Sequence, residues 1–474
     1  MVGAAAVQQR EALEPWGMDA LSLMRRAVEA AADDADAHSL LAAADVVMIP
    51  QGTWPAAGNP AAVVLPWNPS VRSVVAEIGV LQQTLLSRAC SMVAAGDADI
   101  EVIVGGEAKY RALQAQIAGV ALDDPSPDGV ATERMVPAHE IVTREEIERG
   151  LPVPARQYAM IDTALRAHDG LSPSEHIDLL ADLQARSSAV AVGNPLAWNR
   201  VAAPAGAIRD APMMAWPYTK LHCSQWNVDQ AAAVIVCSTA AAARHGVDAD
   251  RRVFPVLGVE SNLMVPMTLR ADVHRSPAIA ALGDAVSEHT GLDPAGIDLV
   301  ELYSCFPAAI SVQQRELGID PSLATTITGG MTFAGGPLNN ATLQSTVAMI
   351  HAVRSGGAGH GMVTNVSGML TKVGLTLWSA RPPEQPFRAV DVTGVATAAT
   401  AVSPFDATFA GTANVVTYTV AFDRGEPVHG IVVAETSAGV RALASTTNPS
   451  LITDMLTTDW YKREVHVDGP ALLA

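Results

Sequence analysis

Apolar and polar residues alternate along the first quarter of the chain with two different periods. Helix-like spacing occurs at residues 24–32 and 80–95, and short apolar runs typical of buried strands occur at residues 45–50 and 100–107. Strands that alternate with helices in this way predict an α/β layer built around a buried sheet.

Between Tyr110 and about Gln225 the spacing becomes irregular and prolines become frequent. A short helical pattern at residues 173–189 lies within this stretch. We therefore expect a long insertion that forms a lid over the ligand end of the sheet.

The layered pattern returns in residues 252–381, and part of it resembles the first layer. The helical segment that begins Leu81-Gln82, with the strand after it, has a counterpart in the segment that begins Leu343-Gln344. An internal duplication of an α/β half is the economical explanation for the match.

The chain changes character after residue 386. Three prolines in residues 382–386 indicate a stiff linker. Residues 415–422 and 429–435 then alternate apolar and polar side chains on either side of a turn at Gly425, which predicts a hairpin. We expect a small, separate β-barrel or β-sandwich here.

Residues 298–337 combine features that are typical of a binding pocket. An apolar run ends in Tyr303, Ser304 and Cys305, and two glycine pairs follow at 329–330 and 335–336. Paired glycines permit positive φ angles and a close approach of the backbone to a ligand. The stretch therefore predicts the rim of a pocket.

Composition and charge narrow the possible functions. A formal net charge of −19 argues against nucleic acid as the main partner, because phosphates require a basic surplus. The longest apolar run, residues 231–243, is shorter than the about 20 residues of a membrane-spanning helix, and the start lacks a secretory-signal pattern. Four widely separated cysteines show no metal-ligand spacing. We expect a cytoplasmic protein without a bound metal.

Six segments together form a specific pattern: residues 193–198, 216–220, 227–231, 301–306, 328–337 and 365–368. In these segments the sequence resembles the thiolase superfamily, specifically the branch around sterol carrier protein 2 thiolase. Within that branch it most resembles the actinobacterial thiolase-like protein type 1, which has an added C-terminal domain.

The resemblance implies an α/β thiolase fold with two pseudo-symmetric βαβαβαββ halves in five layers. The expected units are residues 1–247, with the inserted lid at about 110–225, then residues 248–383, and finally a small all-β, OB-like domain at 387–474. It also implies a homodimer formed through an edge strand of the first half, although the added domain leaves a monomer open.

Thiolases use four catalytic side chains, and the resemblance implies that all four are substituted here. The nucleophilic cysteine corresponds to Gly79, the Asn or His of the strand end to Tyr303, the activating histidine to Gly336, and the acid/base cysteine to Asn365. A glycine provides neither a thiolate nor a base, so ordinary thiolysis is not expected. Backbone N–H groups near Gly79 and Ser367 would still form an oxyanion pocket for a thioester carbonyl.

Three polar side chains are candidates for remaining chemistry. The Tyr303 phenol is either a proton donor or a hydrogen-bonded core side chain. The amides of Asn339 and Asn340 either orient a thioester oxygen or a water molecule, or form a turn. Cys305 lies in an apolar corner, where core packing of a neutral thiol is expected.

Coenzyme A or an acyl-CoA is the expected ligand, with no permanently bound cofactor. Lys220, Arg200 and Arg209 are candidates for its phosphates, with solvated surface charge as the alternative. Trp226 and Trp198 either stack on adenine or contribute to packing.

We therefore expect an acyl-CoA-binding protein of the acyltransferase class without thiolase turnover. Two rival hypotheses remain. One is a retro-aldol lyase or other CoA-thioester enzyme that uses Tyr303 with Asn339 or Asn340. The other is a non-catalytic acyl-CoA binder or subunit of a complex.

Overall fold

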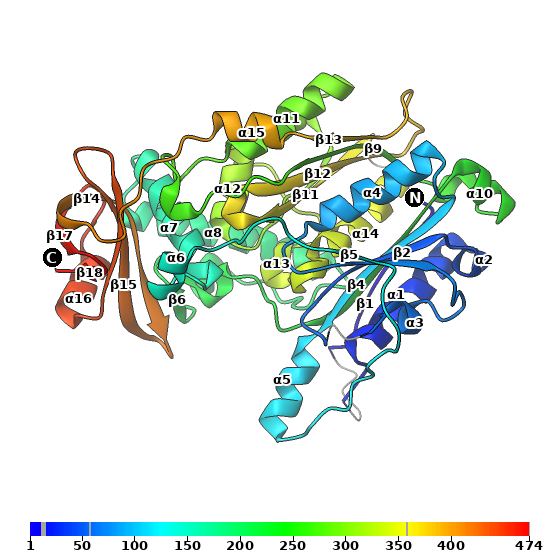
Figure 1. Ribbon diagram of the computed structural model, residues 1–474, viewed down its shortest axis with the longest axis horizontal. Helices are drawn as coiled ribbons and strands as arrows, with labels where there is room; N and C mark the ends of the chain where they lie inside the picture. The colour runs from blue at the N-terminus through cyan, green and yellow to red at the C-terminus, as the bar shows by residue number, and fades with distance from the viewer. Residues whose placement is uncertain (11–15, 56–57, 357–358, 474) are drawn as a thin grey trace.

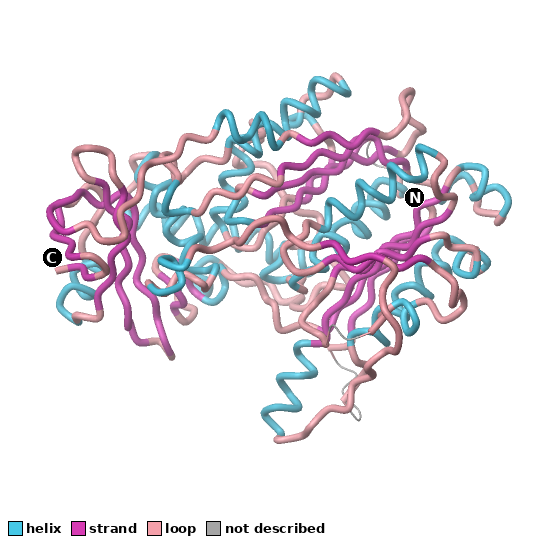
Figure 2. Tube along the Cα trace, in the orientation of Figure 1, coloured by secondary structure: helices cyan, strands magenta, loops and turns pink. Residues whose placement is uncertain are grey.

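The computed structural model describes residues 1–10, 16–55, 58–356 and 359–473. Its strands form three groups. Figure 2 shows two sheets in the body of the molecule and a third group at the end that carries the C-terminus.

The first sheet has six strands in the order β1-β8-β4-β2-β3-β5. Four of them, β2 to β5, run parallel, whereas β8 runs antiparallel to β4 and β1 antiparallel to β8. Near-continuous apolar runs suit strands that are covered on both faces. The strands are β1 (Gly3–Gln8), β2 (Val46–Pro50), β3 (Arg72–Ala76), β4 (Ile100–Ala108), β5 (Glu133–Met135) and β8 (Asp229–Cys237).

The second sheet has five strands in the order β10-β11-β12-β9-β13. β10 is parallel to β11 and β13 is parallel to β9, while the two remaining pairings are antiparallel. The strands are β9 (Phe254–Ser261), β10 (Leu299–Glu301), β11 (His360–Ser367), β12 (Lys372–Ser379) and β13 (Arg388–Asp391).

The two sheets repeat one arrangement, as the sequence match predicts. The order and directions of β1-β8-β4-β2 recur in β9-β12-β11-β10, and helices of 14 residues, α4 (Gln82–Ala95) and α14 (Ala341–Arg354), precede the equivalent strands β4 and β11. The repeat is incomplete. Within the described residues, the second sheet has no strand equivalent to β3, so the expected βαβαβαββ pattern is wrong for the second half at this point.

Helices cover the outer faces of both sheets, and α4 and α14 lie between the sheets (Figure 1). α1 to α3 pack on the outer face of the first sheet, and α11 and α12 pack on the second. These helices are α1 (Ala20–Ala35), α2 (Ser39–Ala42), α3 (Ala61–Val64), α11 (Pro277–Thr290) and α12 (Pro307–Glu316).

The expected lid is more ordered than its proline content suggests. The helix predicted at 173–189 extends over 21 residues as α8 (Pro173–Gly193), because Ser172 and Glu175 form a capping box and Pro173 suits the first turn. The region also contains β5, which belongs to the first sheet. Its other elements are α5 (Lys109–Ala118), α6 (Arg144–Glu148), α7 (Pro154–His168), α9 (Ala205–Arg209), β6 (Met213–Ala215) and β7 (Tyr218–Thr219).

The C-terminal strands form a closed ring, in which β14, β15, β16, β18 and β17 pair in turn and β17 pairs back to β14. The expected barrel is therefore present, but it is not separate. Ala215 of β6 pairs with Ala421, and Trp216 packs in the core of the ring. The strands are β14 (Ala410–Asp423), β15 (Glu426–Glu435), β16 (Arg441–Thr446), β17 (Glu464–Asp468) and β18 (Ala471–Leu472), with helices α15 (Thr393–Ala399) and α16 (Pro449–Thr457).

The linker also differs from the sequence expectation. β13, which falls inside the domain expected to begin at residue 387, is the edge strand of the second sheet, because Arg388 to Asp391 pair with Leu257 to Glu260. Backbone pairing with a strand more than a hundred residues away leaves no local sequence signal.

Candidate functional site

The N-termini of the two central helices meet in the interior, and each receives a side-chain cap from a distant element. Leu81, the N-cap residue of α4, has no polar side chain, and the Oδ1 atom of Asn365 on β11 accepts from the N–H of Gln83 at 3.3 Å. The Oε1 atom of Gln82 accepts from the N–H groups of Thr342 and Leu343 at 2.9 and 3.2 Å. Side-chain amides therefore occupy N–H donors at both helix starts.

Asn365 is 3% exposed. Gln83 fills the space beside it, since its Oε1 accepts from the Thr376 hydroxyl at 2.7 Å and its side chain lies against Gly374. The expected acid/base position thus holds a neutral amide in a packed hydrogen-bond network.

Gly79 lies in the loop before α4 with φ of +106°. Its carbonyl accepts from the Nζ atom of Lys372 at 2.6 Å. Burial lowers the pKa of Lys372, while Glu260 opposes that shift, and burial raises the pKa of Glu260 itself. This pair of ionisable side chains beside the expected nucleophile position was missed by the sequence analysis. The only signal was a lysine at the start of an otherwise apolar run.

The backbone of Tyr303 is held on both sides. Its N–H donates to the Thr364 hydroxyl at 2.8 Å, and its carbonyl accepts from the Nε2 atom of Gln313 at 2.8 Å. The ring is half-buried at the edge of an apolar cluster. Burial raises the pKa of the Tyr303 phenol, so the hydroxyl stays protonated and can donate.

Cys305 is buried, and burial raises the pKa of its thiol to about 12. A neutral thiol is a poor nucleophile, so its environment fits the packing role expected from the sequence. Cys90 and Cys223 are also buried, with the pKa of each thiol raised to about 12 by the same cause.

Residues 328–337, called the glycine loop below, contain the short helix α13 (Gly330–Phe333) and approach neighbouring chain segments closely. Gly329 adopts φ of +99°, and a Cβ at this position would lie 2.4 Å from the Cβ of Ala191 on α8. A Cβ at Gly336 would lie 2.0 Å from the Ser224 hydroxyl oxygen, and the Gly336 N–H donates to the Gln225 carbonyl at 2.8 Å. Ser224 therefore occupies the space into which a side chain at 336 would project.

Asn339 and Asn340 connect the glycine loop to the first sheet. The Nδ2 atom of Asn339 donates to the Gln51 carbonyl at 3.1 Å, and that of Asn340 donates to the Gln230 carbonyl at 3.4 Å. The Oδ1 atom of Asn340 is buried and has no hydrogen-bond partner among the described residues. It lies next to Gly105, where a Cβ would come within 3.0 Å.

The expected ligand-binding side chains each have a local environment of their own. Arg209 pairs with Asp178, Arg200 donates to the Val192 carbonyl, and Lys220 is half-buried in the turn after β7. Trp226 is 48% exposed and lies under the Nζ atom of Lys109, which is 3.4 Å from the ring centroid.

Trp198 is buried and contacts the Arg10 guanidinium and the edge of Tyr110. Lys109, Arg10 and Tyr110 were not singled out in the sequence. A cation followed by an aromatic residue at 109–110 was the available signal.

The glycine loop does line a cavity, as the sequence predicts. A space of about 210 Å³ lies between this loop, β10 and α14, and Gln230, Glu301 and Thr328 are among its lining residues. Glu301 is almost fully buried and accepts from the hydroxyls of Thr326 and Thr328 and from two backbone N–H groups. Burial raises the pKa of its carboxyl group. Tyr303, Asn339, Asn340 and Asn365 are not among the lining residues of this cavity.

Within the described part of the chain, no three His, Cys, Asp or Glu residues are grouped in a way that could hold a metal ion. None of the helices in the same residues is both long and apolar enough to cross a membrane.

Comparison with known families identifies the C-terminal part. Residues 394–469 match the model of the thiolase-like protein type 1 additional C-terminal domain. The chain carries that domain. The sequence resemblance to thiolase-like protein type 1 is thereby confirmed for this region.

Solved structures establish the fold of the whole chain as thiolase-like α/β with a β-rich C-terminal domain. A monomeric SCP2-thiolase like protein type 1 from Mycobacterium smegmatis matches with a TM-score of 0.82 and 22% identity, over 99% of this chain and 96% of that one. The Ltp2-ChsH2(DUF35) aldolase matches with a TM-score of 0.60 and 18% identity, over 80% and 97%.

An acetyl-CoA acetyltransferase from Syntrophomonas wolfei matches with a TM-score of 0.58 and 16% identity, over 80% of this chain and 98% of that one. Among curated proteins, none matches the sequence. The two partial structural matches thus span nearly all of their own chains and leave about a fifth of this chain unmatched, consistent with an added domain.

Proposed function

We propose that this chain binds a coenzyme A thioester and does not catalyse ordinary thiolysis. The observation that carries the proposal is the start of α4, where the Asn365 amide oxygen accepts from the Gln83 N–H. Ordinary thiolysis would require a thiolate at the Gly79 position and an activating imidazole at the Gly336 position.

The surrounding groups support this proposal. Ser224 occupies the space beside Gly336, and the Cys305 thiol is neutral. Two-step acyl transfer needs an activated nucleophile with a base in hydrogen-bond reach. The backbone N–H groups of Gly79 and Ser367 are the proposed contacts for the thioester carbonyl, because a carbonyl oxygen needs only donors.

The remaining assignments belong to the same proposal. By fold, the protein is assigned to the acyltransferase class. Coenzyme A is contacted by Lys220, Arg200, Arg209 and Trp226. The C-terminal ring is an OB-like domain. Binding the phosphates requires Arg209 to leave Asp178, an exchange that is inexpensive for an exposed pair.

A second candidate, a lyase that cleaves a hydroxyacyl-CoA by a retro-aldol step, rests on Tyr303. Its backbone is fixed by Thr364 and Gln313, and its phenol is held neutral, as a proton donor should be. The fold is also similar to that of the Ltp2-ChsH2(DUF35) aldolase. In this candidate Asn339 or Asn340 would orient the substrate.

The experiment that tests both candidates combines binding and turnover. Stabilisation of the purified chain by acetyl-CoA and by a hydroxyacyl-CoA is measured as a thermal shift, because a ligand of the folded state raises the melting temperature. Turnover of hydroxyacyl-CoA and ketoacyl-CoA is measured for the wild type, Tyr303→Phe and the control Tyr461→Phe. Tyr461 lies beside Lys462 on the C-terminal domain.

Binding without turnover supports the proposed function. Lyase turnover that falls at least tenfold in Tyr303→Phe, with binding and Tyr461→Phe unaffected, supports the second candidate. Thiolysis at thiolase rates, or the absence of a thermal shift with every acyl-CoA, contradicts the proposal.

A further inference from the structure

A large groove lies at the end of the second sheet that is remote from the candidate site. Its volume is about 890 Å³, within the range of small-molecule pockets. Strands β11 and β12 extend from the candidate site to the groove. Asn365 pairs with Gly374 at the candidate site, and His360 pairs with Ser379 at the groove. Asn365 is five steps along an extended strand from His360, which is about 17 Å. The groove is therefore distinct from the candidate site.

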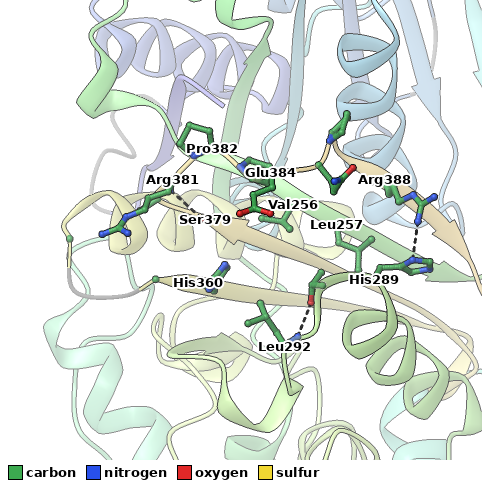
Figure 3. Close-up of a pocket in the computed structure, with 17 residues that line it drawn as sticks. Val256, Leu257, His289, Leu292, His360, Ser379, Arg381, Pro382, Glu384 and Arg388 are labelled. Atoms are coloured by element: carbon green, nitrogen blue, oxygen red, sulfur yellow. Dashed lines mark hydrogen bonds between the residues drawn. The ribbon is translucent and has the colours of Figure 1, made fainter.

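Figure 3 shows how the groove is built. Val256 and Leu257 of β9 form its floor, the end of α11 forms one wall, and the segment 382–386 forms the roof. Apolar side chains, including Leu292, contribute much of this lining. The body of a ligand here would therefore contact hydrocarbon.

The roof is a fixed feature of the groove. Its five residues include Pro382, Pro383 and Pro386, which restrict the backbone. At one end the Arg381 N–H donates to the Ser379 hydroxyl, and at the other β13 joins the sheet. A groove with a stiff roof needs little ordering to bind a ligand.

Hydrogen-bond donors lie at both ends of the groove, with Arg381 and His360 on the side of Glu384 and the Arg388–His289 pair at the other end (Figure 3). Arg388 donates from Nη1 to the Nδ1 atom of His289 at 3.1 Å. A guanidinium has no acceptor, so His289 accepts through Nδ1 and carries a proton on Nε2. The pair therefore offers an imidazole N–H and the remaining guanidinium N–H groups, which favour a carboxylate or phosphate.

Glu384 is the one carboxylate among the described residues that line the groove, and it lies away from this pair. In Figure 3, Glu384 extends from the roof into the groove and faces His360, away from the Arg388–His289 end. Like charges repel across a site with apolar walls. An anionic group would therefore bind at the Arg388–His289 end.

We propose that this groove binds a small amphiphilic anion, with its carboxylate or phosphate on Arg388 and His289 and its apolar body on Val256, Leu257 and Leu292. The chain has a formal net charge of −19, whereas the Arg388 end of this apolar groove is positively charged. The electrostatic potential at this end therefore differs in sign from that expected for the protein as a whole. This site is independent of the proposed coenzyme A function.

The test measures binding of four probes to the full chain by titration calorimetry: hexyl phosphate, hexanoate, hexanol and inorganic phosphate. We expect hexyl phosphate or hexanoate to bind at least tenfold more tightly than hexanol and than inorganic phosphate. The stronger of the two anions identifies the headgroup chemistry.

Variants then locate the site. Arg388→Gln and, independently, His289→Gln are expected to weaken binding of the preferred probe at least tenfold and threefold, with unchanged melting temperatures. Arg424→Gln is the matched control, because Arg424 is exposed at the turn between β14 and β15. Glu384→Gln is expected to leave binding unchanged or to tighten it.

Three results would overturn the proposal. Hexanol that binds as tightly as both anions would show that the Arg388–His289 end does not recognise an anion. Equal affinity in the wild type, Arg388→Gln and His289→Gln would place the binding elsewhere. A tenfold loss in Glu384→Gln alone would indicate a cationic ligand.

Discussion

Two buried glutamates, Glu301 and Glu101, differ in the hydrogen bonds that their carboxyl groups receive. Glu301 accepts from two hydroxyls and two N–H groups around the start of the glycine loop, so its role is to order that loop. Glu101 on β4 is fully buried, and neither carboxylate oxygen has a hydrogen-bond partner among the described residues. Burial raises the pKa of Glu101 from 4.5 to about 8. The folded chain therefore holds a proton that the unfolded chain releases.

Replacing Glu101 by Gln should flatten the dependence of stability on pH. Between about pH 5 and 8 the folded state binds more protons than the unfolded state, so the free energy of unfolding falls as pH rises. One proton corresponds to a slope of up to about 1.4 kcal/mol per pH unit. Urea unfolding at several pH values measures the slope. The exposed Glu288→Gln should keep the wild-type slope, and equal slopes in all three proteins would contradict the expectation.

Gly329→Ala should be among the most destabilising single-methyl additions in the chain. The new Cβ would meet backbone and side-chain atoms of Ala191 at 2.4 to 2.6 Å, in addition to the cost of φ at +99°. Gly96→Ala is the matched control, since Gly96 has φ of +79° and open space around its Cβ position. We expect a loss of about 1 kcal/mol at Gly96 and about 3 kcal/mol at Gly329 in urea unfolding. If both variants lose a similar free energy of unfolding, α8 must shift to accommodate the methyl group at position 329.

At the scale of elements, β5 decides which strand of the first sheet is available to pair with another chain. It pairs in parallel with β3, which would otherwise be the edge strand. Arg88 on α4 holds it through two contacts with Glu133 at 2.6 and 2.7 Å, and Ser73 and Thr132 exchange hydrogen bonds. The resemblance to thiolases implied a homodimer through such an edge. The edge that β5 presents in place of β3 has only three residues instead of five, so it offers less unpaired backbone for such a contact.

The wild-type chain should therefore be a monomer in light scattering after size exclusion. The double variant Arg88→Ala/Glu133→Ala should loosen β5 by about 1 kcal/mol and show a mass that rises with protein concentration. Arg144→Ala/Glu148→Ala removes an exposed pair within α6 and serves as control. A stable wild-type dimer, or association that is equal in both variants, would show that β5 does not prevent association through the edge of the first sheet.

Elements with a strong local pattern were predictable from the sequence, whereas elements defined by their partners were not. The helix at 80–95 and the strand at 100–107 appear as α4 and β4 because their apolar periodicity is complete within the segment. β6 and β13 are short and take their identity from distant strands, so their place was missed. At the site, the resemblance to thiolases singled out Tyr303 and Asn365. The contact of Lys372 with Gly79 and the caps formed by Asn365 and Gln82 depend on how the two halves meet.

At the scale of the molecule, the C-terminal ring is attached to the insertion by buried polar contacts as well as by β6. Arg166 on α7 is 3% exposed and pairs with Asp459 at 2.7 Å. The Thr417 hydroxyl on β14 donates to the Met160 carbonyl on the same helix. These contacts predict that the ring unfolds together with the insertion.

Asp459→Asn should weaken that attachment, because it leaves the buried Arg166 charge without its partner. The expected loss is about 2 kcal/mol, less than for a fully buried pair because Asp459 is partly exposed. Asp454→Asn, which breaks an exposed pair with Arg463, should cost less than about 1 kcal/mol. Calorimetry should show one transition in the wild type and an earlier, separate transition in Asp459→Asn. Two separate transitions in the wild type would contradict the shared unfolding.

The pairing of β13 with the second sheet has a practical consequence for the design of truncated fragments. A truncation just before residue 387 would remove the strand that pairs with β9 and leave the backbone edge of Leu257 to Glu260 unpaired. Exposed edges of this kind recruit other chains and promote aggregation. A fragment that stops after residue 391 keeps β13 paired with β9, and it is the better starting point for studying the thiolase-like body alone.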